Sequence, residues 1–573
     1  MIDIDLNMKL GLLSTIGWII LAFAFLGCST FLMEYEIWAQ LTTLTSPSGQ
    51  PKEGGSPDGQ KLGLPTFNPS RASSSLPPSL TVNQKENLSN FTEAQTFSKP
   101  ITPFTNQSIA PPPAVNTQTN ITNSTTIYNN NIDTIHRSLF QTNQNVFFHR
   151  IASFLDTTES TKKFNIMINK TVIPSNVNDY STLPFIYRNE PSVANNGQII
   201  FYVGNFYAAR STDAGNTFKF YPDPVKATDQ LVIYDNIHHI FIWYQQGFPD
   251  NFGKNKVYIN ISHDALNWWT YVIDSSTLFG PSWKDKKIDF PHLALTKNSL
   301  YYASNIMEPT GAVNNNNRTF IAKISLDDLA NGRNPSFSYY FSDSLFNFTP
   351  VQGATDTMYW ATHISNQRMA IYKWNDSEPA SKVIKTESDI PSWTPSGIAY
   401  SCPTSDNDYC SNADDRITTG WISDGKVGWM WNVDKGGGFK WPYVNSAIFQ
   451  AHNMSYLGRP LIWSNDFALL YPFIAVDQNG NLGLVVSFGG NKTNPSIGVA
   501  YVANHYDTVP PWPIVPVVFG GKPEPFSNQW GDFITIQPYK TNSNESKFIA
   551  SGFTIEGTGN MTHVAPHLIV FGK

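Results

Sequence analysis

The densest group of residues able to do chemistry lies near the middle of the chain. Residues 402–416 read CPTSDNDYCSNADDR, which places Asp406, Asp408 and Asp414 in one loop. Carboxylates at this density, with backbone carbonyl oxygens, are the ligands that Ca²⁺ prefers. The spacing is not that of an EF-hand, because the Gly and the distal Glu are missing. The loop is a candidate Ca²⁺ site, with a solvated acidic loop as the alternative, and the sequence requires no other cofactor.

Two of the 3 cysteines in the chain, Cys402 and Cys410, lie in this acidic loop. A close pair in an otherwise nearly Cys-free chain predicts a disulfide formed in an oxidising compartment. A reduced pair is the alternative, so this expectation depends on export of the chain.

The N-terminal part of the chain indicates such an export route. Residues 10–33 carry no charge, and a run of this length spans a bilayer as a helix. Lys9 precedes the run and Glu34 follows it, which favours a cytoplasmic N-terminus and an extracellular remainder. We expect a signal anchor or transmembrane segment over residues 1–35. The alternative is cleavage near Cys28, whose FLGC context is similar to a lipobox, giving a secreted or lipid-anchored protein.

The next segment, residues 36–150, is rich in Ser, Thr, Pro and Asn. Such a composition offers too little apolar surface to offset the entropy of ordering, so it predicts a disordered stalk. N-x-S/T sequons recur along the exported part, for example at Asn120, Asn260 and Asn453, and make glycosylation an expectation. A net charge of -6 without a long basic run argues against nucleic acid as a partner.

Residues 151–573 have the texture of an all-β domain, with short aromatic and β-branched runs between Asn, Asp and Gly turns. One unit recurs seven times: an apolar strand, a polar turn and a second apolar strand. The copies start at Glu190, Asp229, Asp289, Gly353, Asp415, Tyr471 and Gly531. Each interval holds about four strands, which predicts a β-propeller of about seven, alternatively six, blades. A stack of sandwich domains is the competing architecture.

The stretch STDAGNTF at residues 211–218 predicts a tight turn. Its characteristic residues are Ser211, Asp213, Gly215, Thr217 and Phe218. Asp213 can accept hydrogen bonds from turn N–H groups, and Gly215 permits a left-handed conformation. The stretch resembles the Asp box, or BNR repeat, of the sialidase-like propeller superfamily, with Phe218 in place of Trp. Weaker echoes are SHDALNWW at 262–269 and NVDKGGGF at 432–439. The resemblance covers residues 164–573 at the level of fold.

The same resemblance implies where an active site would be. Sialidases use three arginines for the substrate carboxylate, a Tyr nucleophile paired with Glu, and an Asp acid/base. In this sequence the corresponding candidates are Arg188, Arg416, Tyr471 and Glu190, although the Arg188 context YRNEP departs from the family's Arg-Ile-Pro. Arg459 is a further candidate for the third arginine. The Asp boxes of the family lie away from its active site, so we expect Asp213 to hold a turn.

Two functions follow as hypotheses. The first is a membrane-anchored, extracellular module that binds a glycan or a protein through the propeller mouth. The alternative is a glycoside hydrolase of exo-sialidase type acting on cell-surface or extracellular glycans. For either function, we expect the site where the first strands of the blades begin around the central channel, at Glu190, Asp229, Asp289, Asp415 and Tyr471.

Overall fold

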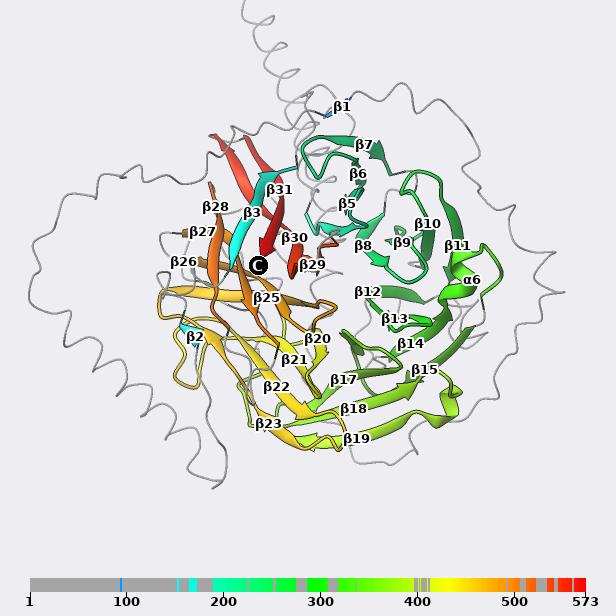
Figure 1. The fold of residues 1–573 in the computed structure, drawn as a ribbon. Helices are drawn as coiled ribbons and strands as arrows, with labels where there is room; N and C mark the ends of the chain where they lie inside the picture. Colours follow the sequence, from blue (N-terminus) through cyan, green and yellow to red (C-terminus); the bar gives the residue numbers. More distant parts are fainter. Residues whose placement is uncertain are drawn as a thin grey trace, which may run out of the picture.

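Four-stranded antiparallel sheets arranged in a ring form the body of the protein (Figure 1). The computed structural model describes residues 164–172 and 189–573, with gaps, and the two-residue strands β1 (Glu93–Ala94) and β2 (Ala152–Ser153). The gaps are residues 224, 226, 251–253, 275–285, 308–317, 336, 396–399, 401, 403–409, 411–412, 491–492, 505–511, 522–532, 541–544 and 559–560. The predicted membrane segment lies outside the described residues, as does the predicted stalk apart from β1.

The first three blades follow one another along the chain, and each is a meander in which neighbouring strands are antiparallel. Blade 1 comprises β4 (Ser192–Asn195), β5 (Ile200–Gly204), β6 (Tyr207–Ser211) and β7 (Phe218–Pro222). Blade 2 comprises β8 (Thr228–Asp235), β9 (Ile240–Gln246), β10 (Lys256–Ser262) and β11 (Trp269–Asp274). Blade 3 comprises β12 (Lys287–Leu295), β13 (Ser299–Met307), β14 (Arg318–Ser325) and β15 (Phe337–Ser342), with the short helix α6 (Leu326–Ala330) before its last strand.

Blades 4 and 5 are joined into one sheet, because their first strands β16 and β20 make a short parallel pairing. Blade 4 comprises β16 (Thr349–Gln352), β17 (Thr357–Ser365), β18 (Arg368–Asn375) and β19 (Ile384–Asp389), with the 3-10 turn η5 (Ala380–Lys382) before β19. Blade 5 comprises β20 (Ile417–Ser423), β21 (Lys426–Val433), β22 (Tyr443–Gln450), β23 (Tyr456–Gly458) and β24 (Ile462–Trp463).

The last two blades complete the ring. Blade 6 comprises β25 (Phe467–Val476), β26 (Leu482–Gly490), β27 (Thr493–Val502) and β28 (Val515–Gly520). Blade 7 comprises β29 (Thr535–Pro538), β30 (Lys547–Thr558), β31 (Met561–Gly572) and β3 (Asn165–Thr171). Since β3 precedes blade 1 in sequence but pairs with the C-terminal strand β31, the two ends of the domain close the ring.

The prediction of an all-β propeller is confirmed, and the described residues form seven blades. In six of them the recurring sequence unit is the pair of first and second strands. In blade 4 the unit that starts at Gly353 was placed one strand too late, because it covers β17 and β18. The hairpin of β17 and β18, with strands of 9 and 8 residues, has a stronger apolar pattern than the 4-residue β16 that precedes it.

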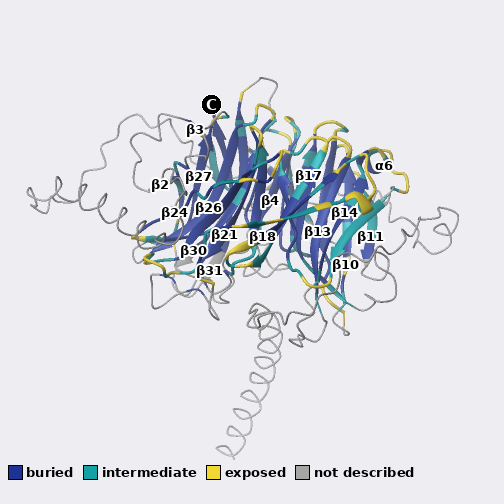
Figure 2. Cartoon of the chain, turned by 90° about the horizontal axis from the view of Figure 1, so that it is seen from below, coloured by how far each residue is buried: buried dark blue, intermediate teal, exposed yellow. Residues whose placement is uncertain are grey.

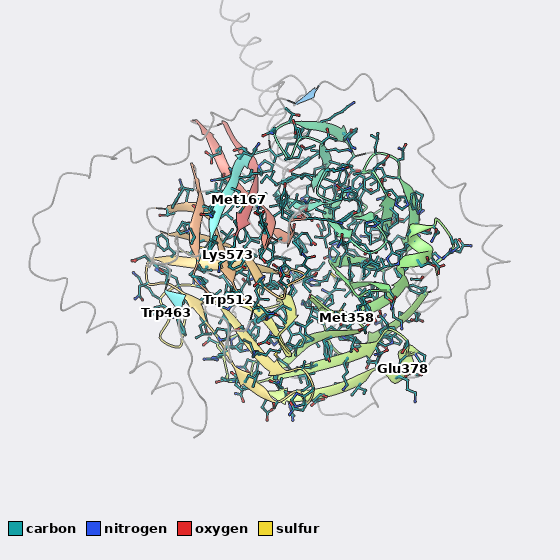
Figure 3. All side chains as sticks on the ribbon, viewed as in Figure 1. Met167, Met358, Glu378, Trp463, Trp512 and Lys573 are labelled. Carbon is teal, nitrogen blue, oxygen red and sulfur yellow. A yellow bond between two sulfur atoms is a disulfide. The ribbon has the colours of Figure 1, made fainter. Side chains whose placement is uncertain are left out.

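Aromatic side chains pack both between and within blades; Figure 3 draws the described side chains on the ring, with Trp512 labelled. Trp421 of blade 5 meets Trp512, which precedes the last strand of blade 6, with ring centroids 5.8 Å apart. Trp360 and Tyr372 stack at 5.1 Å within blade 4. Figure 2 shows buried residues running along the strands, while exposed residues lie mainly in the connections. Packing between neighbouring repeats therefore stabilises the ring.

The two faces of the ring carry different connections. Ser192 pairs with Val203, so β4 begins beside the end of β5. Ile200 pairs with Ser211, so β6 ends beside the start of β5. We call the face on which the first strands begin the mouth face; it also carries the connections from second to third strands. The turns from third to fourth strands lie on the opposite face.

A search of the described residues for a helix long and apolar enough to cross a membrane finds none.

Candidate functional site

The mouth face carries a repeated backbone feature at the beginning of the first strands. In five blades a residue other than glycine adopts a positive φ there: Glu190 (57°), Asp229 (48°), Phe290 (57°), Asn347 (64°) and Tyr471 (55°). In β8, β12 and β25 the pairing register also shifts at this point. Positive φ costs energy for such residues, and bulges re-aim side chains, so both are features that cluster at functional sites.

Asparagines link this feature from blade to blade. In three cases the side-chain oxygen of an Asn at the end of a second strand accepts the backbone N–H of the positive-φ residue in the next blade. The pairs are Asn205 with Asp229 (3.1 Å), Asn305 with Asn347 (2.8 Å) and Asn432 with Tyr471 (2.7 Å). We call these contacts the asparagine latches. They fix the strained residues in place at the rim of the mouth.

Two carboxyl groups meet between blades 2 and 3. The side-chain amide of Gln246 donates to Asp229 Oδ2 and to Asp289 Oδ1, at 2.9 Å each. These two oxygens are therefore no more than 5.8 Å apart, the sum of the two distances. Lys287 Nζ lies 3.3 Å from Asp289 Oδ2, and both side chains of this ion pair are largely buried.

The environment of this pair keeps a proton on one of its members. Burial and, next, the negative charge of Asp289 raise the pKa of Asp229 to about 7, against the opposite effect of Lys287. A carboxyl group with such a pKa can donate a proton near neutral pH, and the neighbouring carboxylate bonded to Lys287 supplies negative charge. Acid and charged base thus stand side by side.

A third carboxylate belongs to the same hydrogen-bonded chain. Asn205 Nδ2 donates to Glu190 Oε2 at 3.0 Å, while its side-chain oxygen accepts from the N–H of Asp229. Asn189 donates to Glu190 Oε1 at 3.4 Å. Blades 1, 2 and 3 are therefore connected at the mouth face by one polar chain that runs from Glu190 to Lys287. We call this chain the carboxylate site.

Of the sequence-derived catalytic candidates, Glu190, Arg416 and Tyr471 come to the mouth face. Arg416 Nε lies 2.6 Å from Asp414 Oδ2, and its guanidinium stacks 3.8 Å over the ring of Phe290. The Tyr471 side chain is buried, and its backbone is held by an asparagine latch. Arg459 donates to the carbonyls of two residues that follow β19, at the outer part of blade 5. Arg188 lies outside the described residues.

The STDAGNTF turn lies on the opposite face, between β6 and β7. Asp213 accepts hydrogen bonds from Ser211 Oγ (2.7 Å), Thr217 N (2.9 Å) and Thr217 Oγ1 (2.7 Å). Gly215 has φ 81°, and the Phe218 side chain is buried. These contacts hold the turn, which faces away from the carboxylate site.

The two weaker echoes of this motif differ in position. Ser262 and Asp264 repeat the same hydrogen bond at 2.9 Å, in the equivalent turn of blade 2. The NVDKGGGF stretch connects β21 to β22, so it lies on the mouth face and is not equivalent to the other two. Its interpretation as an echo of the STDAGNTF turn was wrong, because it belongs to a connection from a second to a third strand and not from a third to a fourth.

The acidic loop is only partly described. A disulfide joins Cys402 and Cys410, as predicted. Asp414 is bonded to Arg416, and Asp406 and Asp408 lie outside the described residues. In the described part of the chain, no group of three or more His, Cys, Asp or Glu side chains could hold a metal ion. The Ca²⁺ expectation for this loop stays a prediction.

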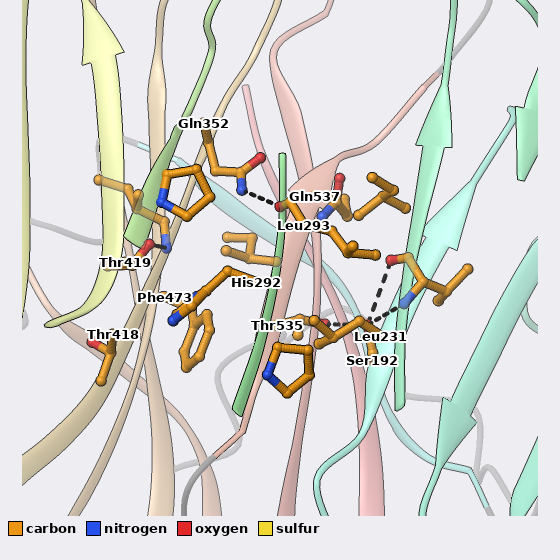
Figure 4. Close-up of a pocket in the computed structure, with 16 residues that line it drawn as sticks. Ser192, Leu231, His292, Leu293, Gln352, Thr418, Thr419, Phe473, Thr535 and Gln537 are labelled. Atoms are coloured by element: carbon orange, nitrogen blue, oxygen red, sulfur yellow. Dashed lines mark hydrogen bonds between the residues drawn. The ribbon is translucent and has the colours of Figure 1, made fainter. Parts of the chain in front are cut away.

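A cavity lies where the first strands of the seven blades come together (Figure 4). Its lining comes from first strands and is mostly apolar or hydroxylic, with Thr535 Oγ1 bonded to Ser192 Oγ at 3.1 Å and Gln352 bonded to the Leu293 carbonyl at 2.9 Å. His292 also lines it, and burial lowers the pKa of its imidazole to about 3. No carboxylate lines this cavity, so the acid–base groups lie above it, at the mouth face.

Sequence reasoning named Asp229 and Asp289 only as places where first strands begin. It missed Gln246, Lys287 and the asparagine latches. A signal for the latches exists, since the second strands concerned end as YVGN, YASN and WMWN.

Comparisons with known proteins support the fold alone. No protein-family model matches the chain, and no curated protein matches it. Similar solved structures include the N-terminal domain of Nup159, with 10% identity over 72% of this chain and 96% of that chain, at a TM-score of 0.35. An α-L-arabinanase from Penicillium chrysogenum has 10% identity over 57% and 94% of the two chains, at a TM-score of 0.32. A Trypanosoma rangeli sialidase has 11% identity over 66% of each chain, at a TM-score of 0.32. At fold level the chain resembles the sialidase-like propellers.

Proposed function

We propose that this protein is a glycoside hydrolase that acts at the carboxylate site. The observation that carries the proposal is the pair of Asp229 and Asp289, one with its pKa raised to about 7 and the other bonded to Lys287. Hydrolysis of a glycosidic bond needs one carboxylic acid and one carboxylate on either side of the bond. The limit of 5.8 Å between their bonded oxygens suits the retaining class, whose carboxyl groups are about 5–5.5 Å apart, better than the inverting class.

The roles follow from the charges. Asp229 gives its proton to the oxygen of the departing sugar, so the bond from that oxygen to the anomeric carbon breaks. The Asp289 carboxylate forms a bond to the anomeric carbon from the opposite side. Asp229, now ionised, takes a proton from water, whose oxygen displaces Asp289 and restores both groups. Gln246 orients the two carboxyl groups and yields its hydrogen bonds when the sugar enters.

The setting that we propose is outside the cell. The uncharged run at residues 10–33 would anchor the chain in the membrane, and residues 36–150 would hold the propeller away from it. The disulfide between Cys402 and Cys410 supports an oxidising compartment. Surface or extracellular glycans would then be the accessible substrates.

A second candidate is a module that binds a glycan or a protein without cleaving it. The observation in its favour is that Gln246 and Lys287 already engage both carboxyl groups, and that Arg416 is engaged by Asp414. A site with its polar groups mutually bonded can recognise a ligand at its rim without reacting with it.

The test is hydrolysis of a panel of fluorogenic glycosides, with a glycan array beside it. The proposal predicts turnover of at least one glycoside, reduced by about 100-fold or more in both D229N and D289N. D356N, which changes an exposed carboxylate of blade 4, is the matched control and keeps wild-type activity. Array binding without turnover of any glycoside would favour the binding module.

A further inference from the structure

Two phenylalanines stack on the mouth face beside the carboxylate site. The rings of Phe206 and Phe248 have centroids 5.6 Å apart and planes 13° apart. Phe248 is 55% exposed, although most aromatic side chains of the described residues are buried. An aromatic side chain this exposed, stacked on a second aromatic ring at the protein surface, is typical of a binding site.

The position of this pair is set by residues of the carboxylate site itself. Phe206 directly follows Asn205, whose side chain binds both Glu190 and the backbone of Asp229. Phe248 follows Gln246 by two positions, in the connection from β9 to β10. Both phenylalanines therefore lie on connections from second to third strands, on the same face as the two carboxyl groups and within two residues of side chains that bind the carboxylate site.

The backbone at Phe206 is strained. It is the second residue of the two-residue turn between β5 and β6, where its φ is 70°. Such a turn position favours Gly or Asn, and a bulky residue there is strained. The Phe206 ring is only partly exposed and packs on Phe248, while a Gly at this position would relieve the strain of the turn.

We propose that Phe206 and Phe248 form a sugar-binding platform on which a neutral pyranose ring of the substrate stacks. The inference rests on the proposed function, which it deepens by naming the substrate class. A pyranose presents an apolar face of C–H groups that matches a flat aromatic surface, while its hydroxyl groups reach polar partners at the edge. Here those partners are the side chains of the carboxylate site.

The charge of the neighbouring groups selects the kind of sugar. In the described part of the carboxylate site, the Asp289 carboxylate engages Lys287, and Glu190 is a second carboxylate that accepts a hydrogen bond from Asn205. An acidic sugar stacked on the platform would bring its own carboxylate towards those of Glu190 and Asp289, which is unfavourable. An uncharged hexopyranose or N-acetylhexosamine avoids this repulsion. The substrate class is therefore a neutral oligosaccharide, in contrast to the sialic acids implied by the family resemblance.

The experiment uses the full-length protein carrying D229N, so that the sugar is bound but not consumed. Saturation-transfer NMR with neutral glucose-, mannose-, galactose- and N-acetylglucosamine-based pentasaccharides, and with sialyllactose, reports which sugar C–H groups touch the protein. We expect transfer from one neutral sugar and none from sialyllactose. F248A and F206G, each added to D229N, weaken binding of that sugar by about tenfold or more.

Two further readouts separate a platform from a structural role. F519A, which removes an equally exposed Phe from the outer strand of blade 6, leaves binding unchanged. F206G keeps or raises the melting temperature while it weakens binding, because the strained turn is relieved. Unchanged binding in F248A, or stronger binding of sialyllactose than of every neutral sugar, overturns the platform.

The same variants distinguish the two proposals. If wild-type protein hydrolyses simple aryl glycosides but F248A binds oligosaccharides as before, the hydrolase stands and the platform is wrong. If F248A loses oligosaccharide binding while no glycoside is cleaved, the platform stands and the hydrolase is wrong.

Discussion

Three buried histidines make the stability of the propeller sensitive to acid. Burial lowers the pKa of His292, His363 and His567 to about 3 each. His363 lies between the rings of Trp393 and Trp431, with centroids 5.2 and 4.7 Å away. In the folded protein these side chains stay neutral at a pH where they would be charged in the unfolded chain.

The size of the effect follows from proton linkage. An unfolded His has a pKa near 6.5, so from about pH 6.5 down to about pH 3 the unfolded state binds a proton that the folded state does not. Unfolding free energy then falls by about 1.4 kcal/mol per His per pH unit, or about 6 kcal/mol for three between pH 6.5 and 5. Asp229 acts in the opposite sense, because its raised pKa lets the folded state bind a proton that the unfolded state does not bind. This binding raises the unfolding free energy by about 2 kcal/mol over the same pH range. The net loss is about 4 kcal/mol.

Guanidinium unfolding at pH 7, 6 and 5 measures this loss. H363F replaces one buried imidazole by a ring that cannot be protonated, so its unfolding free energy falls less steeply with acid, by about 1.4 kcal/mol per pH unit. H452F makes the same substitution at an exposed position and keeps the wild-type slope. Equal slopes for H363F and wild type would refute the reasoning, because His363 would then titrate alike in both states.

Three further changes have expected outcomes. K287M removes the cation that lowers the pKa of Asp229, so the alkaline limb of the pH–activity profile moves above its wild-type midpoint of about 7. N432A leaves the N–H of Tyr471 without its acceptor, and guanidinium unfolding should show a loss of about 1–3 kcal/mol. C402S opens the loop closed by the disulfide, whose cysteines are 8 residues apart, and should cost about 2–3 kcal/mol in the same assay under oxidising conditions.

Control variants at exposed positions test whether the first two effects are specific to the sites named. K297M removes an exposed lysine that pairs with Asp356, and it leaves the pH–activity profile in place. N375A changes an exposed Asn at the end of β18 and should cost less than N432A. If K287M leaves the alkaline limb of the pH–activity profile unchanged, a group other than Asp229 sets that limb. If N375A and N432A lower the unfolding free energy equally, the asparagine latch at Tyr471 does not contribute to stability.

The sequence was sufficient for the architecture because the propeller repeats a local pattern. Each pair of first and second strands is contiguous in sequence, so its alternation and its turn can be recognised without knowing the tertiary structure. The short β16 is the exception, since the longer hairpin of β17 and β18 beside it has the stronger pattern. The pairing of β3 with β31 spans almost the whole domain, so no local signal could show how the ring closes.

The site was harder to predict from the sequence, because its residues come together only in the folded protein. Asp229 and Asp289 could be named as positions where first strands begin, but their meeting depends on Gln246, which lies 17 residues from one and 43 from the other. The raised pKa of Asp229 is a property of that three-dimensional arrangement. Motif resemblance directed attention to arginines instead, because it transfers the chemistry of a family along with its fold.

The most direct test of the central claim is an infrared titration of Asp229. A protonated carboxyl group has a C=O stretching band that an ionised one lacks, and the difference between wild-type and D229N protein isolates the band of this residue. The account predicts a band that disappears with a midpoint near pH 7. A midpoint close to the ordinary Asp value of about 4 would contradict it, because Asp229 would then hold no proton to donate at neutral pH.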